Sequence, residues 1–233
     1  MHAALAELLQ LLELERLKIN LFRGASRDIG SPQVFGGQVL GQALRAAYAT
    51  VEGRVVHSLH AYFLRRGDFR APIVYEVDRS RDGHGFSSRR VVAIQHGEQI
   101  FHMAASFQVP EHGLSHQIAM PDVPPPEKLT AEEVSKQPIF KEMPEFIRRY
   151  YESDRPIELR PVELGRYFGQ KIDDGRIHVW IRTAAKLPDD PALYVRTLLA
   201  AGYFEAIAFS GEDRQRAAFY QDNARRVTLH KQA

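Results

Sequence analysis

The sequence has no cysteine and almost no excess of charge of either sign. Without cysteine there are no disulfides, so the fold must be stabilised by packing. The 31 Lys and Arg residues nearly balance the 29 Asp and Glu residues, for a net charge of +2. Because the two signs alternate along the chain, no basic surface for nucleic acid is expected. With 233 residues, 44% of them hydrophobic, the chain is typical of a globular protein with one large or two small domains.

Long apolar runs are also missing. The N-terminal stretch, residues 1–22, carries Glu7, Glu13 and Glu15 among its leucines, which excludes a signal peptide and a membrane span. With neither an export signal nor cysteine, we expect a cytoplasmic protein. Short signatures for zinc, nucleotide phosphates, dinucleotides or a serine nucleophile are absent, so we predict no metal and no cofactor.

Two helices are predicted in the first half of the chain. Residues 4–18 have leucines near helical spacing, which predicts an amphipathic helix on the outside of the domain, with a partner-docking helix as the alternative. Residues 34–51 are apolar on nearly every face, which predicts a helix buried on all sides. Its glycines, Gly36, Gly37 and Gly41, favour close approach of another backbone, as a surrounding sheet would provide.

Strand-like segments follow this helix, separated by short turn sequences. They cover residues 54–64, 72–81, 86–96 and 99–109. Short connections join antiparallel neighbours, so each strand is expected beside the next one along the chain. The prediction is an α+β fold in which an antiparallel sheet wraps one buried helix, an arrangement that resembles the hotdog fold.

The second half of the chain has a different composition. Residues 111–156 hold more than half of the prolines and are interpreted as a linker. Strands are predicted at 157–164 and 176–184, and a second apolar helix at 192–209, whose start is marked by Asp189, Asp190 and Pro191. Residues 210–233 are polar and lack strand alternation, so no strands are expected there. We therefore divide the chain into an N-terminal repeat (1–110), a linker (111–156) and a partial second repeat with a divergent tail (157–233).

The histidine pair His57 and His60 suggests a metal site. Their spacing of three on a strand predicts opposite faces, which disfavours a shared metal. His57 shares its face with apolar residues and is interpreted as a core histidine. His60 shares its face with Ser58 and Tyr62, and is a candidate catalytic residue lining a polar site.

A second candidate lies where the buried helix begins. Gly36, Gly37 and Gln38 are predicted to bind substrate, because free backbone N–H groups at a helix start can polarise a carbonyl oxygen and hold an oxyanion. The alternative is that the glycines only let the helix meet a strand. In the second predicted helix, Glu205 is the one acid beyond the opening residues, which makes it a candidate to orient a water.

Long strings of the sequence resemble the acyl-CoA thioesterase II family. They are LFRGASRDIGSPQVFGGQVLGQALRAAYATV, VHSLHAYFLRRGD, RDGHGFSSRRVVAIQHGEQIFHMAASFQVPE, RPIELRPVE and HVWIRTAAKLPDDPALYVRTLLA. The resemblance covers Leu8 to about Ala200. It implies a tandem (double) hotdog whose second repeat is here incomplete, and hydrolysis of fatty acyl-CoA to fatty acid and coenzyme A without metal or cofactor.

The resemblance also implies catalytic residues that this chain does not match. Family members use an Asp late in the second helix, then a Ser or Thr and a Gln on later strands. At the position of the Asp this sequence has Ala201-Gly202-Tyr203-Phe204, and Glu205 lies one or two positions away, which on a helix is a rotation of ~100–200°. Either the C-terminal part is truncated by a stop or frame change, or it belongs to a divergent member.

Three hypotheses about function follow. The chain is an acyl-CoA thioesterase, an acyl-CoA-binding or scaffold protein that lacks the family's catalytic groups, or an enzyme of altered mechanism that uses Glu205 or His60 with the Gly36 and Gly37 amides. An apolar second helix with few strands over it predicts a homo-oligomer in which the second repeats or the 210–233 tails pack together.

Overall fold

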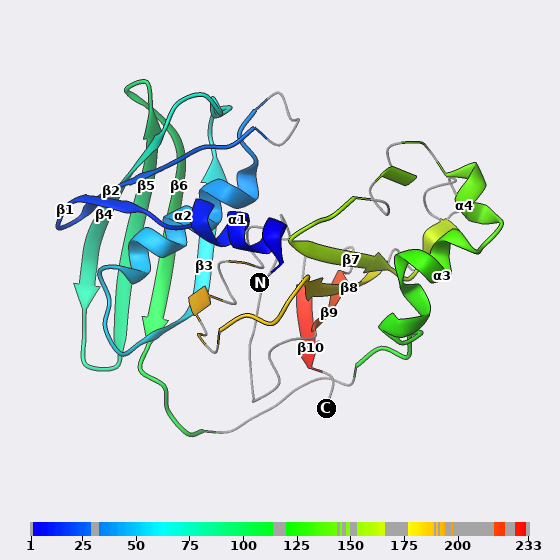
Figure 1. The fold of residues 1–233 in the computed structure, drawn as a ribbon. Helices are drawn as coiled ribbons and strands as arrows, with labels where there is room; N and C mark the ends of the chain where they lie inside the picture. Colours follow the sequence, from blue (N-terminus) through cyan, green and yellow to red (C-terminus); the bar gives the residue numbers. More distant parts are fainter. Residues whose placement is uncertain are drawn as a thin grey trace. The chain divides into compact units, whose positions relative to one another are not determined.

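The computed structural model describes residues 2–28, 33–113, 120–143, 145, 148–149, 153–165, 177–188, 190, 192–193 and 197, and the backbone of 217–221 and 227–231 (Figure 1). The chain divides into two compact units. The first unit comprises residues 6–114 and 187–204, and the second comprises residues 1–5, 115–186 and 205–233.

The first unit is built on a six-stranded antiparallel sheet and helix α2 (Gly36–Tyr48). The strands are β1 (Glu15–Lys18), β2 (Leu21–Gly24), β3 (Val55–Phe63), β4 (Ile73–Asp82), β5 (Phe86–Gln95) and β6 (Glu98–Gln108). Their order across the sheet is β1-β2-β4-β5-β6-β3. Helix α2 packs against β2, β4, β5 and β6, so the predicted α+β arrangement of a sheet against a buried helix is confirmed.

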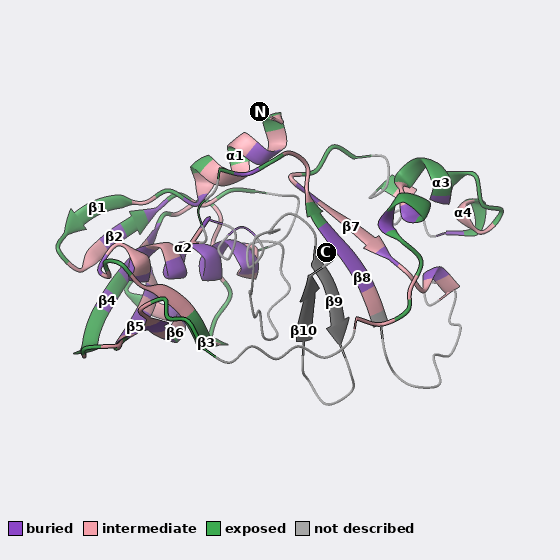
Figure 2. Cartoon of the chain, turned by 90° about the horizontal axis from the view of Figure 1, so that it is seen from below, coloured by how far each residue is buried: buried purple, intermediate pink, exposed green. Residues whose placement is uncertain are grey.

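The core of this unit lies between α2 and one face of the sheet (Figure 2). Side chains alternate along β5 and β6, so that every second residue is buried against the helix. The buried members include Val91, Ala93, Phe101, Met103 and Phe107. We call this the inner face of the sheet; the opposite, more exposed side is the outer face. Helix α2 is buried, as predicted from the apolar residues on nearly all of its faces.

The N-terminal helix is shorter than predicted. Helix α1 spans Ala3–Leu11, not residues 4–18, and Glu15–Lys18 forms the edge strand β1. This strand pairs with β2, opposite residues such as Phe22, and the Arg23 guanidinium donates a 2.8 Å hydrogen bond to Glu15. Leu17 is 40% exposed. The leucine spacing overpredicted the helix because hairpin pairing with β2 satisfies the backbone of these residues in an extended form.

The order of the strands also differs from the prediction. Strand β3 does not lie beside β4; it pairs with β6 on the far edge of the sheet, with Phe63 opposite Phe101. The connection between β3 and β4, residues 64–72, is too long for a tight hairpin and crosses the end of the sheet. Where the connections are short, at β4–β5 and β5–β6, the predicted neighbours do pair.

The second unit contains a four-stranded antiparallel sheet and short helices. The sheet has the order β10-β9-β8-β7, with strands β7 (Ile157–Pro161), β8 (Ile177–Thr183), β9 (Ala217–Gln221) and β10 (Val227–Lys231). The helices are η1 (Pro126–Leu129), α3 (Ala131–Ser135) and α4 (Ile139–Glu142). They lie in the proline-rich stretch.

Strands β9 and β10 correct the expectation that residues 210–233 hold no strands. Each has five residues, so a period of two has little room to show in a polar sequence. The signal that was available is the β-branched and aromatic content of both segments, such as Phe219, Tyr220 and Val227. Most of the second predicted helix, 192–209, lies outside the described residues; at its start the Asp190 carboxylate accepts a 2.9 Å hydrogen bond from the Ala192 N–H.

Candidate active site at the start of the central helix

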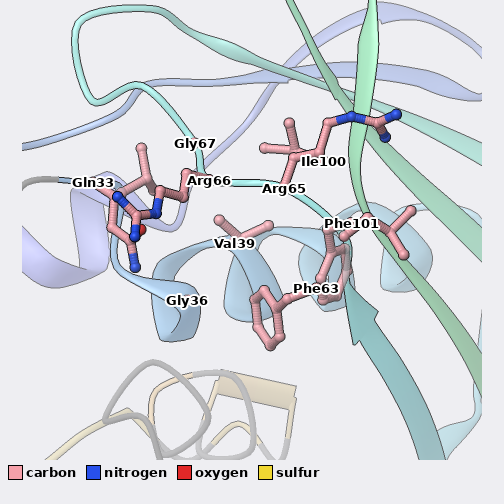
Figure 3. Close-up of a pocket in the computed structure, with 11 residues that line it drawn as sticks. Gln33, Gly36, Val39, Phe63, Arg65, Arg66, Gly67, Ile100 and Phe101 are labelled. Atoms are coloured by element: carbon pink, nitrogen blue, oxygen red, sulfur yellow. The ribbon is translucent and has the colours of Figure 1, made fainter.

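A cleft of about 520 Å³ opens at the N-terminal end of α2 (Figure 3). The segment before the helix, the end of β3, the connection 64–67 and the start of β6 form its walls. Its apolar lining consists of Val34, Val39, Phe63, Leu64, Ile100 and Phe101. The remaining lining residues are Gln33, Gly36, Arg65, Arg66 and Gly67. An apolar pocket with a few polar groups is typical of a small-molecule site.

Helix α2 begins at this cleft, and its first amides have no acceptor within the helix. The N–H groups of Gln38 and Val39 both donate to the Phe35 carbonyl, at 3.1 and 3.4 Å. The amides of Gly36 and Gly37 come before this turn, so the helix offers them no acceptor. Since the helix start also carries partial positive charge, these amides favour a carbonyl oxygen or an oxyanion.

The missing side chain at Gly36 keeps the cleft open at this point. A Cβ atom built on Gly36 would lie 3.1 Å from the ring of Phe63, inside ordinary van der Waals distance. The connection 64–72 also lies close to the segment before the helix, because the Gly67 carbonyl accepts a 2.9 Å hydrogen bond from Val34 N–H. The glycine at the helix start therefore serves close approach and leaves its amide accessible.

The Gln38 side chain points away from the cleft lining. It is buried, and its Nε2 donates a 3.0 Å hydrogen bond to the Ala25 carbonyl. Its Oε1 has no hydrogen-bond partner in the part of the chain that the structure describes. Gln38 thus holds the segment that leads toward the cleft, and its predicted contact with substrate stays a prediction.

Gln42, one turn further along α2, was not singled out from the sequence. Its Nε2 donates to the carbonyls of Leu11 (2.6 Å) and Ala25 (2.9 Å), and its Oε1 accepts a 2.7 Å hydrogen bond from the Tyr75 hydroxyl. Complete burial raises the pKa of Tyr75 well above its usual value, so the hydroxyl remains a donor. The signal was available as two glutamines four residues apart in an otherwise apolar helix.

The histidines of β3 occupy places that the spacing did not predict. The register passes from Val56 opposite Phe107 to Ser58 opposite Ser106, which makes His57 the extra residue of a β-bulge. His57 is exposed and its Nε2 lies 2.8 Å from the Ser106 hydroxyl, so the interpretation as a core histidine is wrong.

Because the bulge adds one residue, both histidines lie on the outer face of the sheet. His60 is exposed opposite Ala104, and its ring packs edge-on against Tyr62, with 4.7 Å between ring centroids. The predicted opposite faces are therefore wrong. His60 is not among the residues that line the cleft. In the described ranges, no group of three or more His, Cys, Asp or Glu residues is arranged to hold a metal ion.

The connection 64–72 is held rigidly at the cleft by Gln95. This buried side chain donates to the carbonyls of Asp68 (2.7 Å) and Ala71 (2.8 Å) and accepts a 2.8 Å hydrogen bond from the Asp68 N–H. Hydrogen bonds from Arg70, aided by His96, lower the pKa of Asp68 and keep its carboxylate charged. The turn therefore presents its neighbouring arginines to the cleft in a fixed arrangement.

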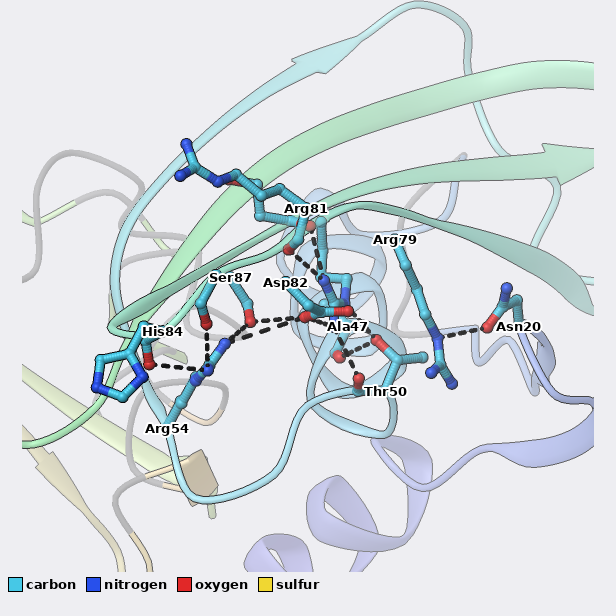
Figure 4. Close-up of polar contacts among 12 residues, drawn as sticks. Asn20, Ala47, Thr50, Arg54, Arg79, Arg81, Asp82, His84 and Ser87 are labelled. Carbon is cyan, nitrogen blue, oxygen red and sulfur yellow. Dashed lines mark hydrogen bonds and ion pairs between the residues drawn. The ribbon is translucent and has the colours of Figure 1, made fainter.

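The opposite end of α2 lies beside a buried arginine of β5. Figure 4 shows the polar contacts of Thr50, Arg81 and Asp82 at that end. Arg89 of β5 donates hydrogen bonds to Thr50 Oγ1 (2.8 Å), the Thr50 carbonyl (2.9 Å) and the Arg81 carbonyl (3.0 Å). Its guanidinium also lies 2.6 Å from Asp82 Oδ1. A hydrogen bond from Ser87, followed by the Arg89 interaction, lowers the pKa of the Asp82 carboxyl. This end of the helix is structural.

Glu205, the predicted catalytic acid, lies outside the described residues.

None of the helices that the structure describes combines the length and the hydropathy needed to span a bilayer.

Comparison with known proteins identifies the family. Residues 24–108 match the model of the acyl-CoA thioesterase N-terminal domain. The chain is 43% identical to acyl-CoA thioesterase 2 of Haemophilus influenzae over 187 residues, which are 80% of this chain and 65% of that protein. The chain thus spans less than two thirds of this relative's length.

Solved structures agree with the sequence matches. The acyl-CoA thioesterase II TesB2 of Mycobacterium marinum is 32% identical, with a TM-score of 0.68 over 93% of this chain and 84% of that one. A conserved protein with a hot dog fold from Alicyclobacillus acidocaldarius, 17% identical, has a TM-score of 0.61 over 96% of this chain and 94% of that one. The hotdog fold is therefore confirmed, and the chain belongs to the acyl-CoA thioesterase II family.

Proposed function

We propose that this chain is an acyl-CoA thioesterase that hydrolyses fatty acyl-CoA to a fatty acid and coenzyme A. The observation that carries the proposal is the cleft at the start of α2, where an apolar wall meets the first turn of the helix, whose leading amides at Gly36 and Gly37 have no acceptor within the helix. The wall suits an acyl chain, and the amides suit the thioester oxygen.

The proposed reaction is attack of water on the thioester carbonyl. The new C–O bond places negative charge on the carbonyl oxygen, which the Gly36 and Gly37 amides stabilise, and the C–S bond then breaks. A general base takes the water proton and returns it to the departing thiolate, which leaves as the thiol. We propose Glu205 as this base, since it is the one acid within residues 192–209. His60 remains the second candidate.

Thiol release from a medium-chain acyl-CoA tests both candidates. Loss of a general base costs roughly 10²–10⁴ in kcat, so we expect Glu205→Gln to lose at least the lower figure. His60→Ala is the matched comparison, and because His60 lies on the outer face of β3 we expect its rate to stay within about threefold of wild type. A large loss in His60→Ala with none in Glu205→Gln would exchange the two roles.

A second candidate function is acyl-CoA binding without hydrolysis. Residues 201–204 favour the binding function, because they do not include the catalytic Asp that the family resemblance implies at this position. Calorimetric titration with coenzyme A, run beside the thiol assay, separates the two functions. Measurable binding with no thiol release above the uncatalysed rate would replace the thioesterase by the binding protein.

We also propose a homo-oligomer in fatty acid metabolism of the cytoplasm. Its support is the edge strand β3, whose end exposes Tyr62, Phe63 and Leu64, each 46–55% accessible. Edge strands with exposed apolar residues favour association. Light scattering at micromolar concentration is expected to give a multiple of the chain mass, and a monomer would contradict the proposal.

A further inference from the structure

The rim of the cleft carries two consecutive arginines with different surroundings. Arg65 donates a 2.7 Å hydrogen bond to the Gln99 carbonyl and lies 3.2 Å from the Glu98 carboxylate, so β6 already neutralises its charge. Figure 3 shows the Arg65 and Arg66 side chains extending to opposite sides of the cleft. The Arg65 guanidinium is therefore paired with a carboxylate, and the Arg66 guanidinium lies apart from it.

Arg66 has no such partner. Among the residues that the structure describes, no carboxylate lies within 4.0 Å of its guanidinium. The nearest acid in sequence, Asp68, is engaged by Arg70 and His96. Gln95 holds the turn that carries Arg66, so the position of its backbone is fixed. The cleft thus combines an apolar wall with an unneutralised cation at its rim.

This combination selects an amphipathic ligand with an anionic group. An exposed guanidinium in a fixed turn matches the geometry of phosphate oxygens, with which arginine forms paired, charge-assisted hydrogen bonds. An acyl chain alone has no anionic group to meet it, and a thioester is neutral. In an acyl-CoA, the groups of the required charge are the phosphates of the coenzyme.

We propose that Arg66 binds a phosphate group of the coenzyme A portion of the substrate, and so sets the preference for acyl-CoA over thioesters that lack phosphates. The inference rests on the proposed substrate and names the residue that recognises its charged part. Arg66 acts on binding; it has no role in breaking the thioester.

Binding of two non-hydrolysable thioethers tests the inference without relying on turnover. One is decyl-CoA and the other is decyl-pantetheine, which keeps the apolar chain and lacks the phosphates. We expect Arg66→Gln to weaken decyl-CoA binding by roughly three- to tenfold and to leave decyl-pantetheine binding unchanged, as one exposed charge-assisted contact would. Arg90→Gln, at an exposed position of β5 that does not line the cleft, is the matched control, with both affinities within about twofold of wild type.

Each outcome decides between the inferences. Equal loss of both ligands in Arg66→Gln, or no loss of decyl-CoA, overturns the role of Arg66 and leaves the thioesterase proposal standing. Selective loss of decyl-CoA in a protein that releases no thiol supports Arg66 and overturns hydrolysis. A wild-type chain that prefers decyl-CoA no more than decyl-pantetheine overturns phosphate recognition.

Discussion

The two ends of helix α2 are built for opposite purposes. At the C-terminal end, Thr50 Oγ1 donates a 2.8 Å hydrogen bond to the Ala47 carbonyl, and Arg89 donates to the Thr50 hydroxyl and carbonyl just beyond the helix. At the N-terminal end, the N-cap residue Phe35 makes no side-chain cap hydrogen bond and Gly36 lines the cleft.

The difference follows from the charge of the helix ends. A cation beside the terminal carbonyls is favourable, so a buried arginine can complete the C-terminal end without leaving polar groups unsatisfied. The N-terminal end is positive and is complete only when a ligand supplies an acceptor. Stability is concentrated at one end of the same helix and ligand binding at the other.

Removing Arg89 should break the structural end, with the largest effect of the changes considered. Arg89→Met leaves the buried Thr50 carbonyl and the Arg81 carbonyl without their donor, and we expect a loss of about 3 kcal/mol in the free energy of unfolding. Urea denaturation measures it. Arg90→Met, at an exposed position of the same strand, is the control and should change stability by less than about 0.5 kcal/mol. Equal losses in both variants would show that Arg89 is not special.

Filling Gly36 should break the binding end and spare the fold. In Gly36→Val the new side chain meets the Phe63 ring and narrows the cleft, so we expect decyl-CoA affinity to fall by about tenfold, or ~1.4 kcal/mol. The unfolding free energy should change by less than about 1 kcal/mol. Gly113→Val is the control, because a side chain there meets nothing within 4 Å. Unchanged affinity in Gly36→Val would remove the cleft as the acyl site.

Protonation of Asp82, near the C-terminal end of α2, should have the smallest effect on stability of the changes considered. Its pKa is lowered in the folded state from the usual 3.8, so its contribution is present above that pH and is lost as pH falls through the lower folded value. We expect Asp82→Asn to cost less than about 1 kcal/mol near neutral pH, since the side chain is half exposed, and the difference from wild type to vanish in acid. A difference that does not shrink as pH falls below 3.8 would contradict this.

Local sequence patterns predicted most of the first unit correctly. Helix α2 lies within three residues of its predicted bounds and strands β3 to β6 within one, because burial on one face imposes a period that the residues must obey. The glycines at positions 36 and 37 were identified because their lack of a side chain matters wherever a helix begins. Short strands such as β1, β9 and β10 were not predicted, because five residues or fewer carry too little periodicity.

The sequence by itself determined helix α2 and strands β3 to β6 of the first unit, the family and the helix start as the candidate site. Only the tertiary structure decided that β3 pairs with β6, that a bulge carries His57 to the outer face, and that Glu98 neutralises Arg65 while Arg66 stays without a carboxylate partner among the described residues. The physical reason is range. Periodicity and turn chemistry act between neighbours in sequence, whereas strand order, register and charge pairing join residues tens of positions apart.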